Sequence, residues 1–115
     1  MTVVLVCGGR FYGNEEFVFA TLDALDAEIR ITRLINGGAT GADALAREWW
    51  KSKQWGEPET YRAKWTKYGK PAGPIRNQQM LDEGKPDLVV AFPGGSGTAD
   101  MIARAKAAGV RVIEP

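Results

Sequence analysis

Histidine is absent from this sequence, and cysteine occurs once, at Cys7, inside an apolar run. The lack of histidine excludes a Ser-His-Asp triad and, together with the single cysteine, removes the usual zinc ligands. We therefore expect neither a metal site nor a bound cofactor. A lone cysteine among apolar residues is typical of a buried side chain in a reducing compartment, which favours a cytoplasmic location.

The sequence also lacks long hydrophobic runs and an excess of charge of either sign. No apolar stretch approaches the ~20 residues that cross a bilayer, so no membrane association is expected. The 15 lysines and arginines nearly balance the 14 acidic residues, which argues against a nucleic-acid partner. Residues 1–115 are enough to form one domain around its own core without disulfides.

Glycine, in contrast, is abundant, and its clusters recur where predicted strands end. The 14 glycines are nearly double the average share of ~7%. Helical patterns begin near residues 14, 42, 74 and 101, between apolar runs that predict strands at 2–7, 33–36, 87–91 and 110–113, with a weaker candidate at 58–63. This alternation predicts an α/β fold, a doubly wound parallel sheet of about five strands with right-handed crossovers.

The segment Phe92–Asp100 joins a predicted strand to a predicted helix and contains three glycines within four residues, from Gly94 to Gly97. A glycine-rich turn before a helix leaves backbone N–H groups exposed, and the helix start adds a partial positive charge of roughly half a unit. We interpret this turn as a phosphate-binding site. The alternative is that the glycines only make the turn tight.

Other candidate segments should lie at the same edge of the sheet, because the loops that follow parallel strands open on one side, where ligands bind. That edge receives glycine clusters beginning at Gly8, Gly37 and Gly94, together with residues 64–77. Arg10 follows the first cluster and suits bidentate phosphate capture. Its alternative role is a salt bridge to the acids at positions 15 and 16.

Residues 60–81 contain no acidic side chain but combine five cations with three aromatics. Such a mixture suits a ligand with a phosphate and a flat ring, or a single nucleic-acid strand, and an ordinary solvated loop is the alternative. We expect Arg76 in the first turn of a helix that begins at Pro74, where a cation opposes the helix dipole unless an anion binds. Asn77 beside it is a candidate for contact with a base edge or a ribose hydroxyl.

Two features of the 40–50 region have structural and functional interpretations. Thr40 and Asp43 have the spacing of a capping box, although Asp43 could also accept a hydrogen bond from a ribose. Trp49 and Trp50 are adjacent and cannot share one helix face. We expect one of them in the core and the other partly exposed or in a contact of a homo-oligomer.

Common nucleotide-binding motifs do not fit the sequence. Gly95-Ser96-Gly97 supplies the first two glycines of a dinucleotide fingerprint, but Asp100 stands where the third should be. No glycine is followed by Lys-Ser or Lys-Thr, as a Walker-type phosphate loop requires.

Four motifs taken together resemble the SLOG superfamily, and within it the small YspA-type, YpsA-related proteins. They are Gly8-Gly9-Arg10, Asn36–Asp43, Gly73–Asn77 and Pro93–Thr98, and the resemblance runs nearly end to end. It implies a Rossmann-like sheet with strand order 3-2-1-4-5 that binds a nucleotide or nucleotide-derived ligand.

Relatives with the last of these motifs include the LOG phosphoribohydrolases, which cleave a base from a ribose monophosphate. Their catalytic glutamate falls at the position of Met101, which cannot ionise. Hydrolysis of this type would therefore need Asp43 or Asp100 in another geometry. The related DprA proteins bind single-stranded DNA, usually with additional domains.

We expect the protein to bind a nucleotide-like phosphorylated small molecule, for sensing, sequestration or processing. The alternatives are a hydrolase that cleaves an N-glycosidic bond with Asp43 or Asp100 as catalytic residue, and a binder of single-stranded nucleic acid. Arg10, Arg76 and the amides of both later glycine clusters would hold the phosphate, and Tyr12 or Trp65 would stack on the base. The candidate ligand-binding residues are Gly8, Gly9, Arg10, Tyr12, Gly37, Gly38, Thr40, Asp43, Trp65, Arg76, Asn77, Pro93, Gly94, Gly95, Ser96, Gly97 and Thr98.

Overall fold

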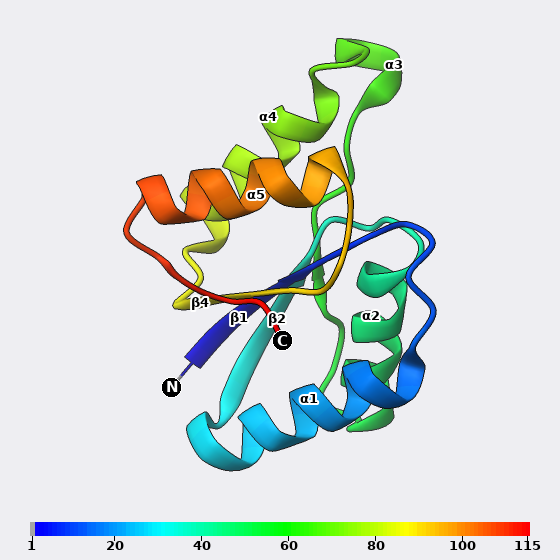
Figure 1. Ribbon diagram of the computed structural model, residues 1–115, viewed down its shortest axis with the longest axis vertical. Helices are drawn as coiled ribbons and strands as arrows, with labels where there is room; N and C mark the ends of the chain where they lie inside the picture. Colours follow the sequence, from blue (N-terminus) through cyan, green and yellow to red (C-terminus); the bar gives the residue numbers. More distant parts are fainter. Residues whose placement is uncertain (1) are drawn as a thin grey trace.

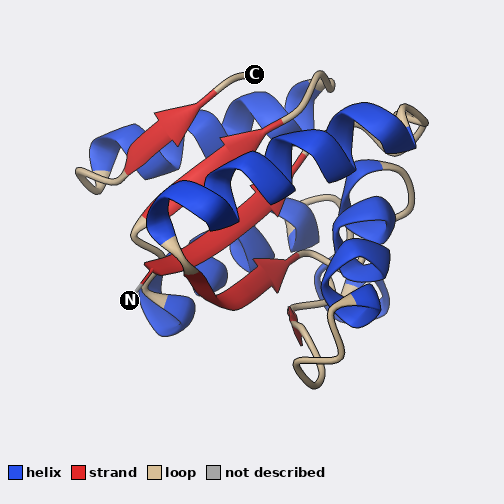
Figure 2. Cartoon of the chain, turned by 90° about the horizontal axis from the view of Figure 1, so that it is seen from below, coloured by secondary structure: helices blue, strands red, loops and turns tan. Residues whose placement is uncertain are grey.

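The computed structural model describes residues 2–115 and confirms the doubly wound α/β fold. Its single sheet has the order β3-β2-β1-β4-β5, with every neighbouring pair parallel, which is the order that the resemblance implies. Figure 2 shows the strands side by side and pointing the same way. They are β1 (Thr2–Cys7), β2 (Ile31–Asn36), β3 (Glu59–Thr60), β4 (Leu88–Ala91) and β5 (Arg111–Ile113).

Helices cover both faces of the sheet. On one side lie α1 (Glu15–Ile29) and α2 (Ala42–Ser52), and on the other lie α4 (Ala72–Gln79) and α5 (Ser96–Ala107) (Figure 1). The single turn α3 (Trp65–Tyr68) precedes α4, and a π-helical turn, η1 (Met80–Gly84), continues it. Within residues 2–115, no helix is long and apolar enough to cross a membrane.

The central strands are apolar on both faces because both faces are packed against helices. Val4 and Val6 of β1 face the α1–α2 layer, where they join Leu22 in one buried cluster. Leu5 points the other way and packs with Met101 of α5 in a second cluster. The alternation along β1 thus divides the core into two layers.

Helix α5 begins at Ser96, five residues before the predicted start. The sequence pattern did not predict a helix here because glycine, which occupies position 97, has a low helix propensity. The connecting turn is therefore only Phe92–Gly95, and Ser96 and Thr98 belong to the first turn of the helix. The α1 start agrees with the prediction, since the Asn14 side chain accepts a hydrogen bond from the Phe17 amide.

Trp49 and Trp50 are both buried, contrary to the prediction that one of them is partly exposed. The loop after α2 supplies a third indole, that of Trp55, whose ring packs edge-on at 6.0 Å from Trp49 and 5.1 Å from Trp50. The Trp49 indole N–H donates to Asp23 at 2.9 Å. Trp50 is therefore buried because Trp55, which lies outside the helix, packs over it.

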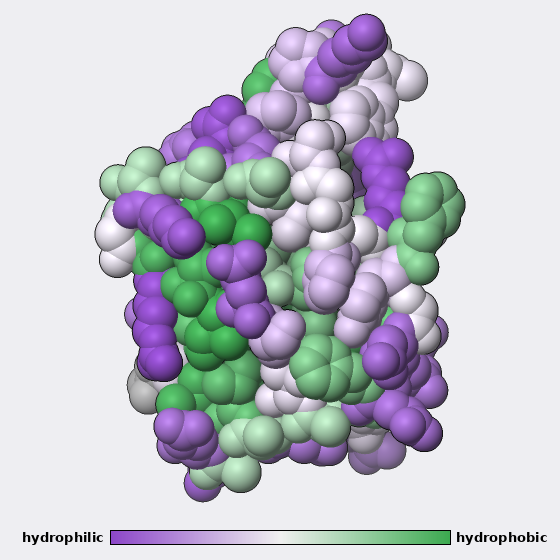
Figure 3. Space-filling model, in the orientation of Figure 1, coloured by the Kyte–Doolittle hydropathy of each residue, from purple (hydrophilic) through white to green (hydrophobic). Residues whose placement is uncertain are grey.

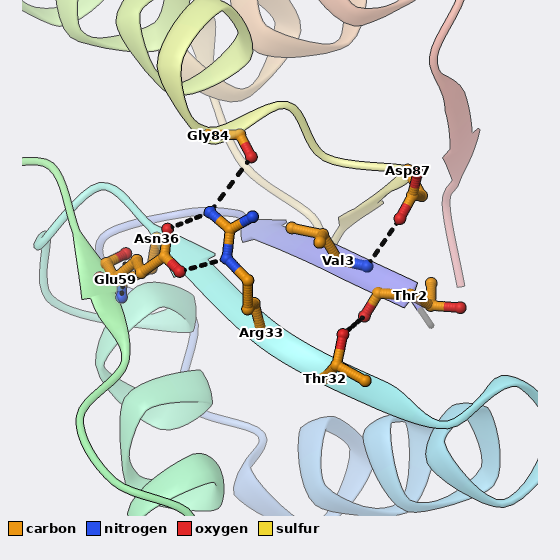
Figure 4. Close-up of polar contacts among 8 residues, drawn as sticks. All are labelled: Thr2, Val3, Thr32, Arg33, Asn36, Glu59, Gly84 and Asp87. Carbon is orange, nitrogen blue, oxygen red and sulfur yellow. Dashed lines mark hydrogen bonds and ion pairs between the residues drawn. The ribbon is translucent and has the colours of Figure 1, made fainter.

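The edge strand β3 has only two residues and is held to its neighbours by Arg33 of β2. The Arg33 guanidinium forms a bidentate ion pair with Glu59 and donates to the Gly84 carbonyl at 3.3 Å (Figure 4). On the far side of the same view, Asp87 accepts from the Val3 amide at 2.8 Å. These side-chain contacts explain why a mostly polar segment still adds to the sheet.

Candidate functional site

A cleft of about 900 Å³ opens at the carboxyl edge of the sheet. The loops after β1, β2 and β4 come together there, on the same side as α3 (Figure 1). All the candidate ligand-binding residues except Gly38 and Thr40 line it, as does Asp100. The lining candidates are Gly8, Gly9, Arg10, Tyr12, Gly37, Asp43, Trp65, Arg76, Asn77, Pro93, Gly94, Gly95, Ser96, Gly97 and Thr98.

The turn after β4 presents unpaired backbone donors to this cleft. Gly94, Gly95, Ser96 and Gly97 are exposed to solvent. Within residues 2–115, the amides from Gly94 to Thr98 donate no hydrogen bond, and the first bond of the helix starts at the Ala99 amide. Unpaired amides at the start of a 12-residue helix are a favourable environment for an anion.

The loops after β1 and β4 approach so closely that side chains are excluded between them. The Gly9 amide donates to the Pro93 carbonyl at 2.9 Å. A Cβ atom at Gly94 would lie 2.2 Å from the Thr98 hydroxyl oxygen and 2.7 Å from the Gly9 nitrogen. Gly94 is therefore needed for packing, independently of any ligand.

The glycine loop after β2 differs, because the protein's own side chains use its amides. Asp43 Oδ2 accepts from the amides of Gly37 and Ala39 at 3.1 and 3.2 Å. The Gly38 amide donates to Asn36 Oδ1 at 2.8 Å. Contrary to our prediction, these amides are not free to hold a phosphate. Gly38 also lies against Arg62, which donates to its carbonyl at 2.9 Å.

The capping box predicted for Thr40 and Asp43 does not form. Helix α2 has Gly41 as its N-cap and no side-chain capping bond. The Thr40 hydroxyl donates instead to the Arg10 carbonyl at 3.0 Å and so ties the β2 loop to the β1 loop. The spacing of the two residues was suitable, but the loop bends at Gly41, whose φ is 72°.

Asp43 is the buried carboxylate of the cleft, with 5% of its surface exposed. Burial raises its pKa, and this outweighs the opposite effects of the Ala39 and Gly37 amides and of Arg76. Within residues 2–115, its second oxygen, Oδ1, has no hydrogen-bond partner. Burial and the charge of Asp43 raise the pKa of the neighbouring Cys7 thiol to about 12, so Cys7 is not a nucleophile at neutral pH.

Arg76 uses two of its three side-chain nitrogens, Nε and Nη1, in hydrogen bonds within residues 2–115. It donates to the carbonyls of Gly37 and Tyr61 and, at 3.1 Å, to Asn77 Oδ1. Burial lowers its pKa, against the effect of Asp43. The predicted position in a first helical turn is wrong, because α4 begins at Ala72 and Arg76 is its fifth residue. Its charge faces the carbonyls of Gly37 and Tyr61, which explains a half-buried cation without a ligand.

Asn77 also has both ends of its amide occupied. Its Nδ2 donates to the Gly97 carbonyl at 3.2 Å and to Asp100 Oδ2 at 3.0 Å. Asp100 Oδ2 accepts from Arg104 as well, at 2.9 Å. These bonds fix the start of α5 against α4, and they favour a positioning role for Asn77 over direct contact with a base.

Two cations of the cleft have no anionic partner. Within residues 2–115, neither Arg10 nor Lys70 forms an ion pair, so the alternative bridge from Arg10 to positions 15 and 16 is absent. The Arg10 guanidinium lies 5.4 Å from the ring centre of Trp65. The segment around α3 that supplies Trp65 and Lys70 projects from the top of the molecule as a hydrophilic surface (Figure 3).

The two predicted stacking residues, Tyr12 and Trp65, both line the cleft. The Tyr12 ring packs 5.6 Å from Phe92 and is partly buried at the edge of the core. Phe11, which the sequence reasoning missed, is fully exposed and lines the cleft. The signal was available, because Phe11 directly follows Gly-Gly-Arg at the end of β1.

Comparison with known proteins identifies the family. The model of the YspA, cpYpsA-related SLOG family matches residues 2–68, which is more than half of the chain. This protein belongs to the YspA, cpYpsA-related SLOG family. The match runs from β1 to α3 and so includes the Gly8-Gly9-Arg10 turn, whereas the Pro93–Thr98 turn of this SLOG protein lies beyond it.

A relative of this SLOG protein is the gene 61 protein of Mycobacterium phage D29. It is 37% identical over 98% of this chain and 95% of its own length. The similarity to this relative, unlike the family match, extends through α4, α5 and the glycine turn before α5.

Proposed function

We propose that the protein binds a nucleotide-like phosphorylated small molecule in this cleft, with the phosphate on the amides of Gly94–Thr98. The observation that carries the proposal is the run of unpaired amides at the start of α5, where Gly94 to Gly97 are exposed and Thr98 is buried. Membership of a SLOG family supports a nucleotide-related role in general terms. Arg10 and Lys70 line the same cleft without partner anions, which favours a negatively charged ligand.

In this proposal Arg76 acts indirectly. Its guanidinium holds the β2 loop and α4 together. The side chain that we expect to bind the phosphate directly is Arg10. The assignment differs from the sequence prediction, in which both arginines contact the phosphate. A positive charge near the turn still favours the anion at a distance, because the site excludes part of the solvent.

Isothermal titration calorimetry with AMP and adenosine tests the phosphate site. Arg10→Ala should weaken AMP binding by about 1–3 kcal/mol, because a charge-assisted hydrogen bond is lost, and should weaken adenosine binding by less. Lys67→Ala is the control, since Lys67 lies over Tyr68 and does not line the cleft. Equal affinity of the wild type for AMP and adenosine would rule out a phosphate site.

A second candidate function is hydrolysis of the N-glycosidic bond of a nucleoside monophosphate, with Asp43 as the acid or base. Asp43 favours it because it lines the cleft, has an unpaired oxygen and has a raised pKa. Met101, at the LOG glutamate position, is buried in the core and does not line the cleft. Asp100 is the weaker candidate because Arg104 and Asn77 use its carboxylate.

The hydrolase candidate predicts that free base is released from one member of a nucleoside monophosphate panel, which chromatography detects. Asp43→Asn should abolish release while nucleotide binding persists. If the wild type binds nucleotides and releases no base, the binding function stands and the hydrolase does not.

A further inference from the structure

Phe11 is an unusual residue on the cleft wall. Its side chain is fully exposed, so it contributes little to folding. A single exposed apolar residue needs no explanation. Phe11, however, lines the same cleft as Trp65, which is 46% exposed. Two solvent-exposed aromatic rings at one ligand cleft are a feature that burial does not explain.

Arg10 lies beside both residues: it is adjacent to Phe11 in sequence, and its guanidinium lies 5.4 Å from the centre of the Trp65 ring. A planar guanidinium on an indole leaves its other face open for a second flat group. We call Arg10, Phe11 and Trp65 the aromatic wall.

Several polar side chains that line the cleft are bonded within the protein, and Asp43 keeps one oxygen, Oδ1, without a partner within residues 2–115. Both ends of the Asn77 amide are bonded within the protein, as are Nε and Nη1 of Arg76. Asp100 is paired with Arg104. Arg10 and Lys70 are donors only, and ring nitrogens and carbonyl oxygens that accept such bonds occur on every nucleobase.

We propose that the aromatic wall recognises the base of the ligand by stacking, so that the protein requires a nucleobase but accepts purine and pyrimidine nucleotides alike. This inference rests on the proposed phosphate site and adds the specificity of the same cleft. Stacking on aromatic side chains tolerates any base because every base has a π-face.

The test measures the affinities of AMP, GMP, CMP, UMP and ribose 5-phosphate by calorimetry. The four nucleotides should agree within about tenfold, and ribose 5-phosphate should bind at least about tenfold more weakly than AMP. Phe11→Ala should weaken AMP binding roughly tenfold and leave ribose 5-phosphate binding unchanged, whereas Trp65→Ala should weaken AMP binding roughly tenfold and ribose 5-phosphate binding by less. Trp65→Phe, which keeps a ring, should retain most of the affinity.

Tyr68→Ala is the matched control, because Tyr68 is a half-exposed aromatic residue of the same helical turn that does not line this cleft. If ribose 5-phosphate binds as tightly as AMP, the aromatic wall does not recognise the base, although the phosphate site remains supported. A preference for one nucleotide by more than about a hundredfold would overturn the inference in the same way, because it requires edge recognition. If none of the five compounds binds, the proposed function fails and this inference with it.

Discussion

Two glycine loops at the same edge of the sheet have opposite uses. In the β2 loop, Asp43 and Asn36 accept from the amides of Gly37, Gly38 and Ala39. In the β4 turn, the amides of Gly94–Thr98 have no acceptor within residues 2–115. Both segments are rich in glycine and follow a parallel strand, but only the second still needs a partner.

The difference indicates that a glycine cluster is a candidate ligand site only where no side chain of the protein accepts from its amides. An acidic residue at the second position of α2 fills the β2 loop. The equivalent part of α5 carries Gly97 and no acid in its first turn. The predictions that follow test whether one loop is a structural element and the other a binding element.

The largest effect is expected for Gly41→Ala in the β2 loop. A Cβ atom there would lie 2.1 Å from the Gly9 carbonyl oxygen, and the φ of 72° is unfavourable for alanine. The free energy of unfolding should fall by roughly 3 kcal/mol. Urea denaturation measures it against Gly95→Ala, where a Cβ meets nothing within 4 Å and the change should stay below about 0.5 kcal/mol. Similar losses in both variants would remove the distinction.

Asp43→Ala should cost about 2 kcal/mol of unfolding free energy, because the amides of Gly37 and Ala39 lose their acceptor inside the protein. Asp43→Asn keeps an oxygen acceptor and should lose less. Denaturation curves of the three proteins at neutral pH provide the comparison. If Asp43→Ala is as stable as the wild type, the acid does not hold this loop.

A smaller effect is expected in the pH dependence of stability. The folded-state pKa of Asp43 is raised by burial, so the folded protein holds this proton more tightly than the unfolded chain. The resulting stabilisation is complete below the unfolded pKa and is lost as pH rises through the folded pKa, by no more than about 1.4 kcal/mol per pH unit. Relative to Asp43→Asn, the wild type should therefore lose stability from pH 4 upward. If the wild type instead gains stability relative to Asp43→Asn as the pH rises above 4, the raised pKa of Asp43 is contradicted.

The smallest expected effect is a gain in stability for Gly97→Ala in the β4 turn. A Cβ atom at Gly97 meets nothing within 4 Å, and alanine is a better helix former by up to ~1 kcal/mol. We expect an increase of about 0.5 kcal/mol near the helix end. Thermal unfolding measures it. Destabilisation would mean that Gly97 has a structural role.

The strand order and most of the cleft could be predicted, because they depend on apolar periodicity and on glycines at strand ends. Fifteen of the 17 candidate ligand-binding residues line the cleft, with Gly38 and Thr40 outside it. What could not be predicted depends on the conformations of loops and on the long-range bonds of Arg76. The cover of Trp50 by Trp55, the use of the Gly37 amide by Asp43 and the bonds of Arg76 join residues whose pairing no local pattern indicates.

The exposure of Phe11 was not predicted either, although it involves no distant contact. Its exposure is a local property of the turn after β1, yet a sequence pattern assigns phenylalanine to the core by default. Tyr12, the neighbouring aromatic residue, is the one that packs against Phe92. Both residues line the cleft, but Phe11 is fully exposed whereas Tyr12 is partly buried.

The most direct test of the account is amide NMR spectroscopy during titration with AMP. The amides of Gly94–Thr98 should exchange rapidly with solvent in the free protein, shift on addition of AMP and become protected. The amides of Gly37 and Ala39 should be protected throughout and should shift little. Saturable shifts confined to Gly37–Ala39, with Gly94–Thr98 unchanged, would contradict the assignment of the two loops.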